Sequence, residues 1–143
     1  LATCDNDAAI TIVDIKIEDV SKLFEQVAIN GVSVDMISQT APKDGKVNVS
    51  FTIAKDDLNE CESVVEKFVS KENIIVDEDI TKFSLVGLGM KHTSGVAAKV
   101  FKIFSDNNIA VKLITTSEIR ITCAISSADK NVAIREVAKE FNI

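Results

Sequence analysis

The stretch KVFKIFSDNNIAVKLITTS, from Lys99 to Ser117, decides the fold, because it repeats KLFEQVAINGVSVDMISQT, from Lys22 to Thr40. The two stretches align without gaps at a constant offset of 77 residues. Five aligned positions are identical, namely Lys22/Lys99, Phe24/Phe101, Asn30/Asn107, Val34/Val111 and Ile37/Ile114. A repeat of this kind indicates two copies of one structural unit.

The flanking segments also correspond, which makes chance a poor explanation for the repeat. AITIVDI (9–15) matches KFSLVGL (82–88), VNVSFTI (47–53) matches IRITCAI (119–125), and CESVVEKF (61–68) matches IREVAKEF (134–141). Alternating β-branched residues predict strands, whereas apolar residues at three- and four-residue spacing predict helices. Each copy therefore reads as strand, helix, strand, strand, helix.

The two copies differ in how they obtain a fourth strand. NIIVD (73–77) supplies one to the first copy, whereas the second copy ends on a helix. We expect the N-terminal LATC to cross over and complete the second sheet, so that the first unit is inserted in the second. The expected domains are residues 8–77, and residues 1–7 with 78–143. The fold class is α+β, with two ferredoxin-like βαββαβ units whose antiparallel sheets carry helices on one face. Unpaired edge strands favour association.

Composition excludes several classes of partner. The chain has 143 residues, a hydrophobic content of 46%, a net charge of -6 and a pI near 4.8. The acidic charge and the lack of a Lys/Arg cluster argue against nucleic acid and against an anionic membrane surface. We find no signal peptide and no apolar run of the ~18 residues that a membrane span needs.

The reactive residue types form no recognisable site. Cys4, Cys61 and Cys123 make no CxxC pair, and His92 has no cysteine or second histidine near it, so no metal site is expected. Cys61 and Cys123 are interpreted as buried, reduced thiols of a cytoplasmic protein. The chain carries neither GxSxG nor HExxH, and no catalytic residue is expected. Because it opens on Leu, we interpret it as a fragment of something longer.

One loop of the second copy differs from its counterpart. GLGMKHTSGVAAKVF (87–101) contains three glycines, whereas DIKIEDVSKLF (14–24) is four residues shorter and has none. A glycine-containing loop that opens onto a helix exposes free N–H groups, which suit a carboxylate or phosphate. The alternative is a chain reversal capped by Thr93 or Ser94. The pattern is neither GxGxxG nor a P-loop.

The strand after each first helix carries polar residues on one side. Strict alternation puts Ser33, Asp35, Ile37 and Gln39 there in the first copy, and Ala110, Lys112, Ile114 and Thr116 in the second. These positions either face water or contact a ligand. In the second case Asp35 would take an ammonium group and Gln39 a hydrogen bond from a side chain.

VGLGMKHTSGVAAKVF (86–101), followed by LITTSEIRI (113–121), resembles the C-terminal regulatory region of aspartate kinases (aspartokinases), where two ACT domains follow a catalytic domain. The resemblance covers essentially the whole chain and implies the ACT fold with the first unit inserted in the second. It implies a parent enzyme that uses ATP to convert aspartate to 4-phospho-aspartate, on the route to lysine, threonine and methionine. This fragment would be no enzyme and need no cofactor, because ATP and Mg would belong to the missing kinase domain.

The resemblance also implies which residues contact an effector. In the first unit they are Ser33, Val34, Asp35 and Gln39, with the loop from Ile15 to Val20. In the second they are Met90, Thr93, Ser94, Gly95, Val96, Ala110, Val111, Ser117 and Glu118. Three features depart from the family: the short first loop without Pro-Gly, Ser94 in place of Pro, and Ala110 in place of a frequent Asn.

The implied partners are a free amino acid effector, lysine or threonine, held between ACT units of a homodimer, and the kinase domain of the same polypeptide. The TTSE turn (115–118) would then cap a pocket, the alternative being a solvated hairpin turn. Two rival functions stay open. One is a structural ACT-type dimerisation module that binds no small molecule. The other is an acylphosphatase-like enzyme, which is disfavoured because neither Arg120 nor Arg135 lies in a loop at a helix start.

Overall fold

A computed structural model describes residues 1–87, 93–117 and 119–143, with the backbone alone for residues 93 and 94. It divides into two compact units. The first unit is Asn6–Glu78, and the second unit joins Leu1–Asp5 to Asp79–Ile143. The chain therefore leaves the second unit after Asp5 and re-enters it at Asp79.

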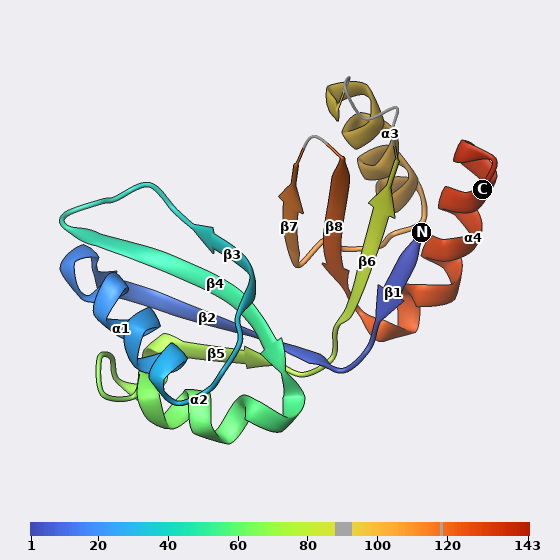
Figure 1. Cartoon of the computed structure of the whole chain (residues 1–143). Coiled ribbons are helices and arrows are strands. Elements are labelled where there is room, and N and C mark those ends of the chain that lie inside the picture. Colours follow the sequence, from blue (N-terminus) through green and yellow to red (C-terminus); the bar gives the residue numbers. More distant parts are fainter. Residues whose placement is uncertain (88–92, 118) are drawn as a thin grey trace. The chain divides into compact units, whose positions relative to one another are not determined.

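The first unit is a four-stranded antiparallel sheet in the order β3-β4-β2-β5. Its strands are β2 (Asp7–Lys16), β3 (Asp35–Gln39), β4 (Lys46–Ala54) and β5 (Ile74–Asp77). Its helices are α1 (Ile17–Ile29) and α2 (Leu58–Val65), with short 3-10 turns at η1 (Lys55–Asp57) and η2 (Lys71–Asn73). Both helices cover the same face of the sheet (Figure 1).

The second unit repeats this plan in the order β1-β6-β8-β7. Its elements are β1 (Ala2–Cys4), β6 (Thr81–Val86), α3 (Thr93–Asp106), β7 (Leu113–Thr116), β8 (Arg120–Ile125), η4 (Ser127–Asp129) and α4 (Lys130–Phe141). The crossover predicted for the N-terminal segment is confirmed, since β1 runs antiparallel to β6 with Ala2 opposite Ser84. The predicted α+β class, two ferredoxin-like units, is therefore correct.

Alternation along the strands produces the two cores. Ala8, Ile10 and Ile12 of β2 are buried, and the residues between them are only partly buried. In the second unit Phe83 and Leu85 of β6 alternate in the same way with the partly buried Lys82 and Ser84 and the exposed Val86. Each sheet thus has one face against its helices and one face without them, which is why both copies could be identified from periodicity.

The first helix of each unit stops at a matching residue. Gly31 follows α1 with a φ of 76°, and its repeat counterpart Asn108 follows α3 with a φ of 56°. Glycine and asparagine are the residues that most readily adopt this left-handed conformation, which ends a helix. The repeat therefore preserves the helix stop although the residue itself has changed.

The first loop predicted for the first unit is wrong. Residues 15 and 16 end β2, and α1 begins at Ile17, so the segment from Ile15 to Val20 is strand and helix. The N–H of Ile17 donates to the carbonyl of Gly45 at 3.0 Å. With four residues fewer than the second copy, the first copy passes from strand to helix without room for a loop.

Candidate functional site

The candidate positions of the first unit lie on or beside β3, an edge strand of its sheet. Ser33, Asp35 and Gln39 are exposed, and Val34 packs partly against the core. The Oδ1 atom of Asp35 accepts the N–H of Met36 at 2.9 Å. The sequence therefore brings these residues together along one accessible edge.

Strict alternation along this strand is wrong. Asp35 lies opposite Thr52 of β4, whereas Gln39 lies opposite Val49, so the two side chains lie on opposite faces of the sheet. The cause is an irregularity between Asp35 and Ser38, where Met36 has a φ of 49°. An extra residue at such a bulge shifts the following side chains to the other face. Asp35 therefore shares its face with Ser38, not with Gln39.

Thr52 stands directly opposite Asp35 and is fully buried. Its hydroxyl oxygen has no hydrogen-bond partner in the described part of the chain. A buried polar atom without a partner costs about 1–3 kcal/mol, so its retention needs a reason. The repeat counterpart in β8 is Ala124, so the second unit has no such hydroxyl.

A hydroxyl pair recurs at the same place in both units, on the face that the helices leave uncovered. Thr11 and Ser50 join β2 to β4 with oxygens 2.9 Å apart, and Ser84 and Thr122 join β6 to β8 at 3.0 Å. These four residues were not among the positions predicted from the sequence. Aligning the two copies could have found them, because hydroxyl residues occupy both positions in both repeats.

The candidate positions of the second unit are spread over three segments. Gly95 is exposed and Val96 packs partly against the core in the first turns of α3, while Ala110 and Val111 precede β7. Ser117 donates its N–H to the carbonyl of Arg120 at 2.8 Å, which closes the turn between β7 and β8. Met90 and Glu118 lie outside the described residues, as do the side chains of Thr93 and Ser94.

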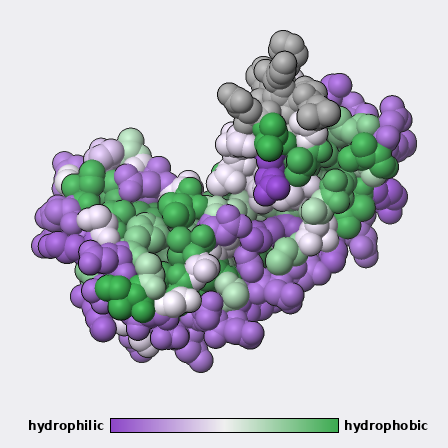
Figure 2. Space-filling model, viewed as in Figure 1, coloured by the Kyte–Doolittle hydropathy of each residue, from purple (hydrophilic) through white to green (hydrophobic). Residues whose placement is uncertain are grey.

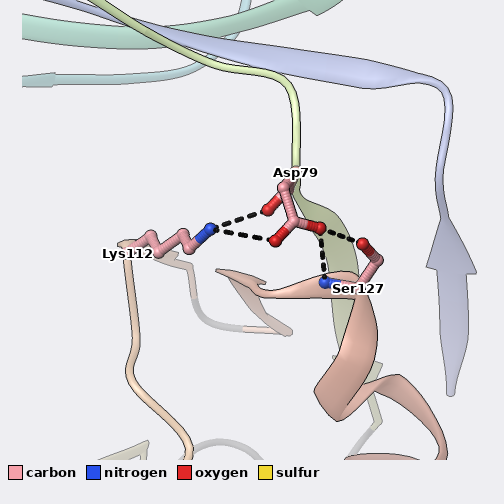
Figure 3. A network of polar contacts seen from close by, with 3 residues as sticks. All are labelled: Asp79, Lys112 and Ser127. Atoms are coloured by element: carbon pink, nitrogen blue, oxygen red, sulfur yellow. Dashed lines mark hydrogen bonds and ion pairs between the residues drawn. The ribbon is translucent and has the colours of Figure 1, made fainter.

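Lys112, next to Val111, has a defined contact. Its ammonium donates to the backbone carbonyl of Asp79 at 2.7 Å and lies 4.0 Å from the carboxylate of the same residue. The Asp79 carboxylate also accepts the N–H of Ser127 at 3.3 Å and the Ser127 hydroxyl (Figure 3). Sequence alone gave no signal for this cluster.

Each unit has a pocket at a hairpin, which joins β3 to β4 in the first unit and β7 to β8 in the second. In the second unit a pocket of about 100 Å³ is lined by Thr115, Thr116, Ser117, Arg120 and Thr122. In the first unit a larger one, about 560 Å³, is lined by Asp14, Thr40, Ala41, Lys43, Asp44, Lys46, Val47 and Asn48. Thr40 and Ser117 are repeat counterparts, as are Asn48 and Arg120, so the two pockets share two positions of the repeat. Hydroxyls and cations line both, which suits a polar ligand.

The described residues offer little support for metal binding or for catalysis by a cysteine. They contain no group of three His, Cys, Asp or Glu side chains that could hold a metal ion. Burial raises the pKa of the Cys61 thiol to about 11, helped by Glu62 and Asp57, and raises the pKa of Cys123 to about 12. Both thiols are therefore protonated near neutral pH and are poor nucleophiles. None of the described helices is long and apolar enough to cross a membrane.

Surface composition is mixed. Hydrophilic side chains dominate the face seen in Figure 2, with hydrophobic patches between them. Ile29, Ile37 and Ile75 of the first unit are between 51% and 67% exposed, and Phe101 of the second unit is 45% exposed. Ile37 belongs to the edge strand β3, where an exposed apolar side chain beside unpaired backbone groups favours contact with another surface.

Comparison with known proteins gives a consistent result. The ACT domain family matches residues 83–141. An aspartokinase from Helicobacter pylori is 39% identical over 124 residues, which are 86% of this chain and 31% of that protein. The chain spans about a third of the length of the curated relatives it matches.

Two solved structures are similar over nearly their whole length. The ligand-free regulatory subunit of aspartate kinase from Thermus thermophilus is 31% identical with a TM-score of 0.85, covering 96% of this chain and 94% of that one. A structure of aspartokinase alpha and beta subunits is 30% identical with a TM-score of 0.88, covering 99% and 97%.

Proposed function

The chain belongs to the aspartokinase family, and on that premise we propose that it is the amino-acid-sensing regulatory part of an aspartate kinase. The observation that carries the proposal is the match to a regulatory subunit over 96% of this chain. The complete protein would transfer phosphate from ATP to the side-chain carboxylate of aspartate. This chain would bind an end product, lysine or threonine, and regulate that activity.

Support for the site comes from the edge strand β3. Its exposed Asp35 offers a carboxylate to a ligand ammonium, and charge-assisted hydrogen bonds of this kind are about twice as strong as neutral ones. In the second unit the first turns of α3 would offer backbone N–H groups to the ligand carboxylate. An amino acid needs both kinds of partner, and a homodimer of ACT units would supply them together.

Regulation would follow from a difference in affinity. A ligand shifts a conformational equilibrium only as far as it binds the two states unequally. Inhibition therefore requires that the effector bind more tightly to the arrangement in which the kinase domain is inactive. The same linkage stabilises the fold, by roughly 2.7 kcal/mol when the effector is at about one hundred times its dissociation constant.

Calorimetric titration of the purified chain with lysine, and separately with threonine, tests the proposal. Sedimentation of the same samples reports whether binding tightens a dimer. Saturable heat with either amino acid, together with a tighter dimer, is the expected result. A dimer that is indifferent to both amino acids would instead favour the structural dimerisation module.

A further inference from the structure

The two crossings of the chain between its units are fastened to the same region of the second unit. The first crossing begins after Asp5, whose carboxylate accepts the Thr81 hydroxyl at 2.7 Å and the Lys130 ammonium at 2.6 Å. The second crossing ends at Asp79, whose carboxylate accepts the N–H and the hydroxyl of Ser127. Ser127 and Lys130 lie one turn apart, where η4 runs into α4.

Lys112 connects this anchored region to the segment before β7, which carries the candidate effector positions Ala110 and Val111. Its own N–H donates to the carbonyl of Ala124 at 2.8 Å, which fixes its backbone to β8. Its ammonium reaches the carbonyl and the carboxylate of Asp79, and its side chain is only 26% exposed (Figure 3). Val111, the preceding residue, packs partly against the core of the unit.

The two contacts that Lys112 makes with Asp79 differ in strength. The ion pair at 4.0 Å, with Asp79 62% exposed, contributes little by itself because water screens it. The hydrogen bond from the ammonium to the carbonyl, at 2.7 Å, is short and charge-assisted, and therefore stronger. Of these two contacts, the one to the backbone of Asp79 is therefore the stronger, and it links the positions of Lys112 and Asp79.

We propose that Lys112 and Asp79 couple the segment 110–112 to the second crossing, so that an effector held by Ala110 and Val111 tightens the point where the chain re-enters the second unit. This inference rests on the proposed sensing function for its ligand. Lys112 acts here as a positioning residue, because it transmits the restraint without touching the effector. In the first unit the repeat counterpart of Lys112 is Asp35, which has the opposite charge and accepts the N–H of its neighbour Met36.

Residue-resolved amide exchange tests the coupling without ligand. Lys112→Met removes the ammonium and keeps most of the side-chain length. It should raise exchange at Ser127, Asp79 and Ile80 about fivefold, the change expected for losing one hydrogen bond. Lys112→Arg retains a cationic donor and should restore most of the protection.

Lys102→Met is the matched control, because it removes an ammonium that binds Asp106 at 2.9 Å on the exposed side of α3. It should leave the three amides unchanged. If the three amides exchange at the same rate in Lys112→Met and in the wild-type chain, the proposal is overturned, whether or not lysine or threonine binds.

The same measurement is then repeated with saturating lysine or threonine. In the wild-type chain the bound amino acid should slow exchange at the three amides about fivefold or more, and in Lys112→Met it should bind with less than about threefold change in Kd but give no such protection. Binding without protection in the wild-type chain overturns the coupling alone. Calorimetric silence from both amino acids overturns the proposed function, and the coupling with it.

Discussion

In the first unit an aromatic pair joins α1 to β4, whereas in the second unit the pair joins α3 to β6. Phe24 and Phe51 pack edge to face with ring centroids 5.4 Å apart, and Phe83 and Phe104 do so at 6.0 Å. The repeat counterparts of Phe83 and Phe104 are Ile10 and Val27, and the counterpart of Phe51 is Cys123. Each core therefore contains one edge-to-face ring pair, but on different positions of one backbone plan.

One ring, that of Phe101, keeps its position in the repeat but not its aromatic partner. Phe101 keeps the position of Phe24, but the residue that Phe24 contacts has become Cys123, and Phe101 is 45% exposed. The comparison shows that both copies keep an edge-to-face ring pair, while the positions that supply the rings differ.

Removing a ring from each unit should give the largest difference in stability between the units. Phe51→Ala should lower the free energy of unfolding by about 3–5 kcal/mol, because it empties a fully buried site. Phe101→Ala should lower it by less than about 1 kcal/mol. Urea unfolding followed by circular dichroism measures both. Similar losses from the two variants would show that the rings have not exchanged roles.

Charge is the next difference, since Asp35 of the edge strand β3 aligns with Lys112, which directly precedes the edge strand β7. Asp35→Asn keeps an oxygen for the N–H of Met36 but removes the negative charge. Loss of a charged hydrogen bond, about 1.5–3 kcal/mol, should weaken lysine or threonine binding about tenfold or more in calorimetry. Asp56→Asn, an exposed acid away from β3, serves as control. Unchanged affinity in Asp35→Asn would remove this residue from the site.

Two glycines provide a third contrast, because replacing Gly45 in a hairpin and Gly95 in a helix should change stability in opposite directions. Asp44 and Gly45 form the tip of the first-unit hairpin with φ of 53° and 75°, the conformation of a two-residue type I′ turn. Gly45→Ala should cost about 1–2 kcal/mol, because a Cβ disfavours that φ. Gly95→Ala in α3, where a Cβ would meet nothing within 4 Å, should stabilise by up to about 1 kcal/mol. Thermal unfolding of both variants tests the pair of signs.

Breaking a hydroxyl pair should have the smallest effect on stability, and the effect should be equal in the two units. Thr11→Val and Ser84→Ala each break one hydroxyl pair and should each cost about 0.5–1.5 kcal/mol. The two losses in urea unfolding should agree within about 0.5 kcal/mol, because the pairs are equivalent. A large difference would mean that one pair has a further role in its unit.

Much of the fold could be predicted because its signals are periodic. The alternation in β2 and β6 reports burial directly, and the constant offset of the stretches that begin at Lys22 and Lys99 reports the repeat. The crossover of the N-terminal strand followed from counting strands in each copy. Fold class needed no knowledge of individual contacts.

The site was harder to predict for two physical reasons. Met36 adopts a positive φ with no glycine or asparagine to announce it, so strict alternation placed Gln39 on the wrong face. The contacts of Asp79 with Lys112 and Ser127 join residues that are distant in sequence and individually ordinary on a surface. Effector contacts at Asp35 and Ser117 stay predictions, which calorimetry can test.

The insertion of one unit in the other also sets an order of assembly during synthesis. β1 leaves the ribosome before its partner β6, which follows only after the whole first unit has been made. Residues 6–78 are contiguous and can fold at once, whereas the second unit must wait for its final helix. Until then β1 presents an unpaired edge, and the slow step in folding should be the closure of this long-range strand pair.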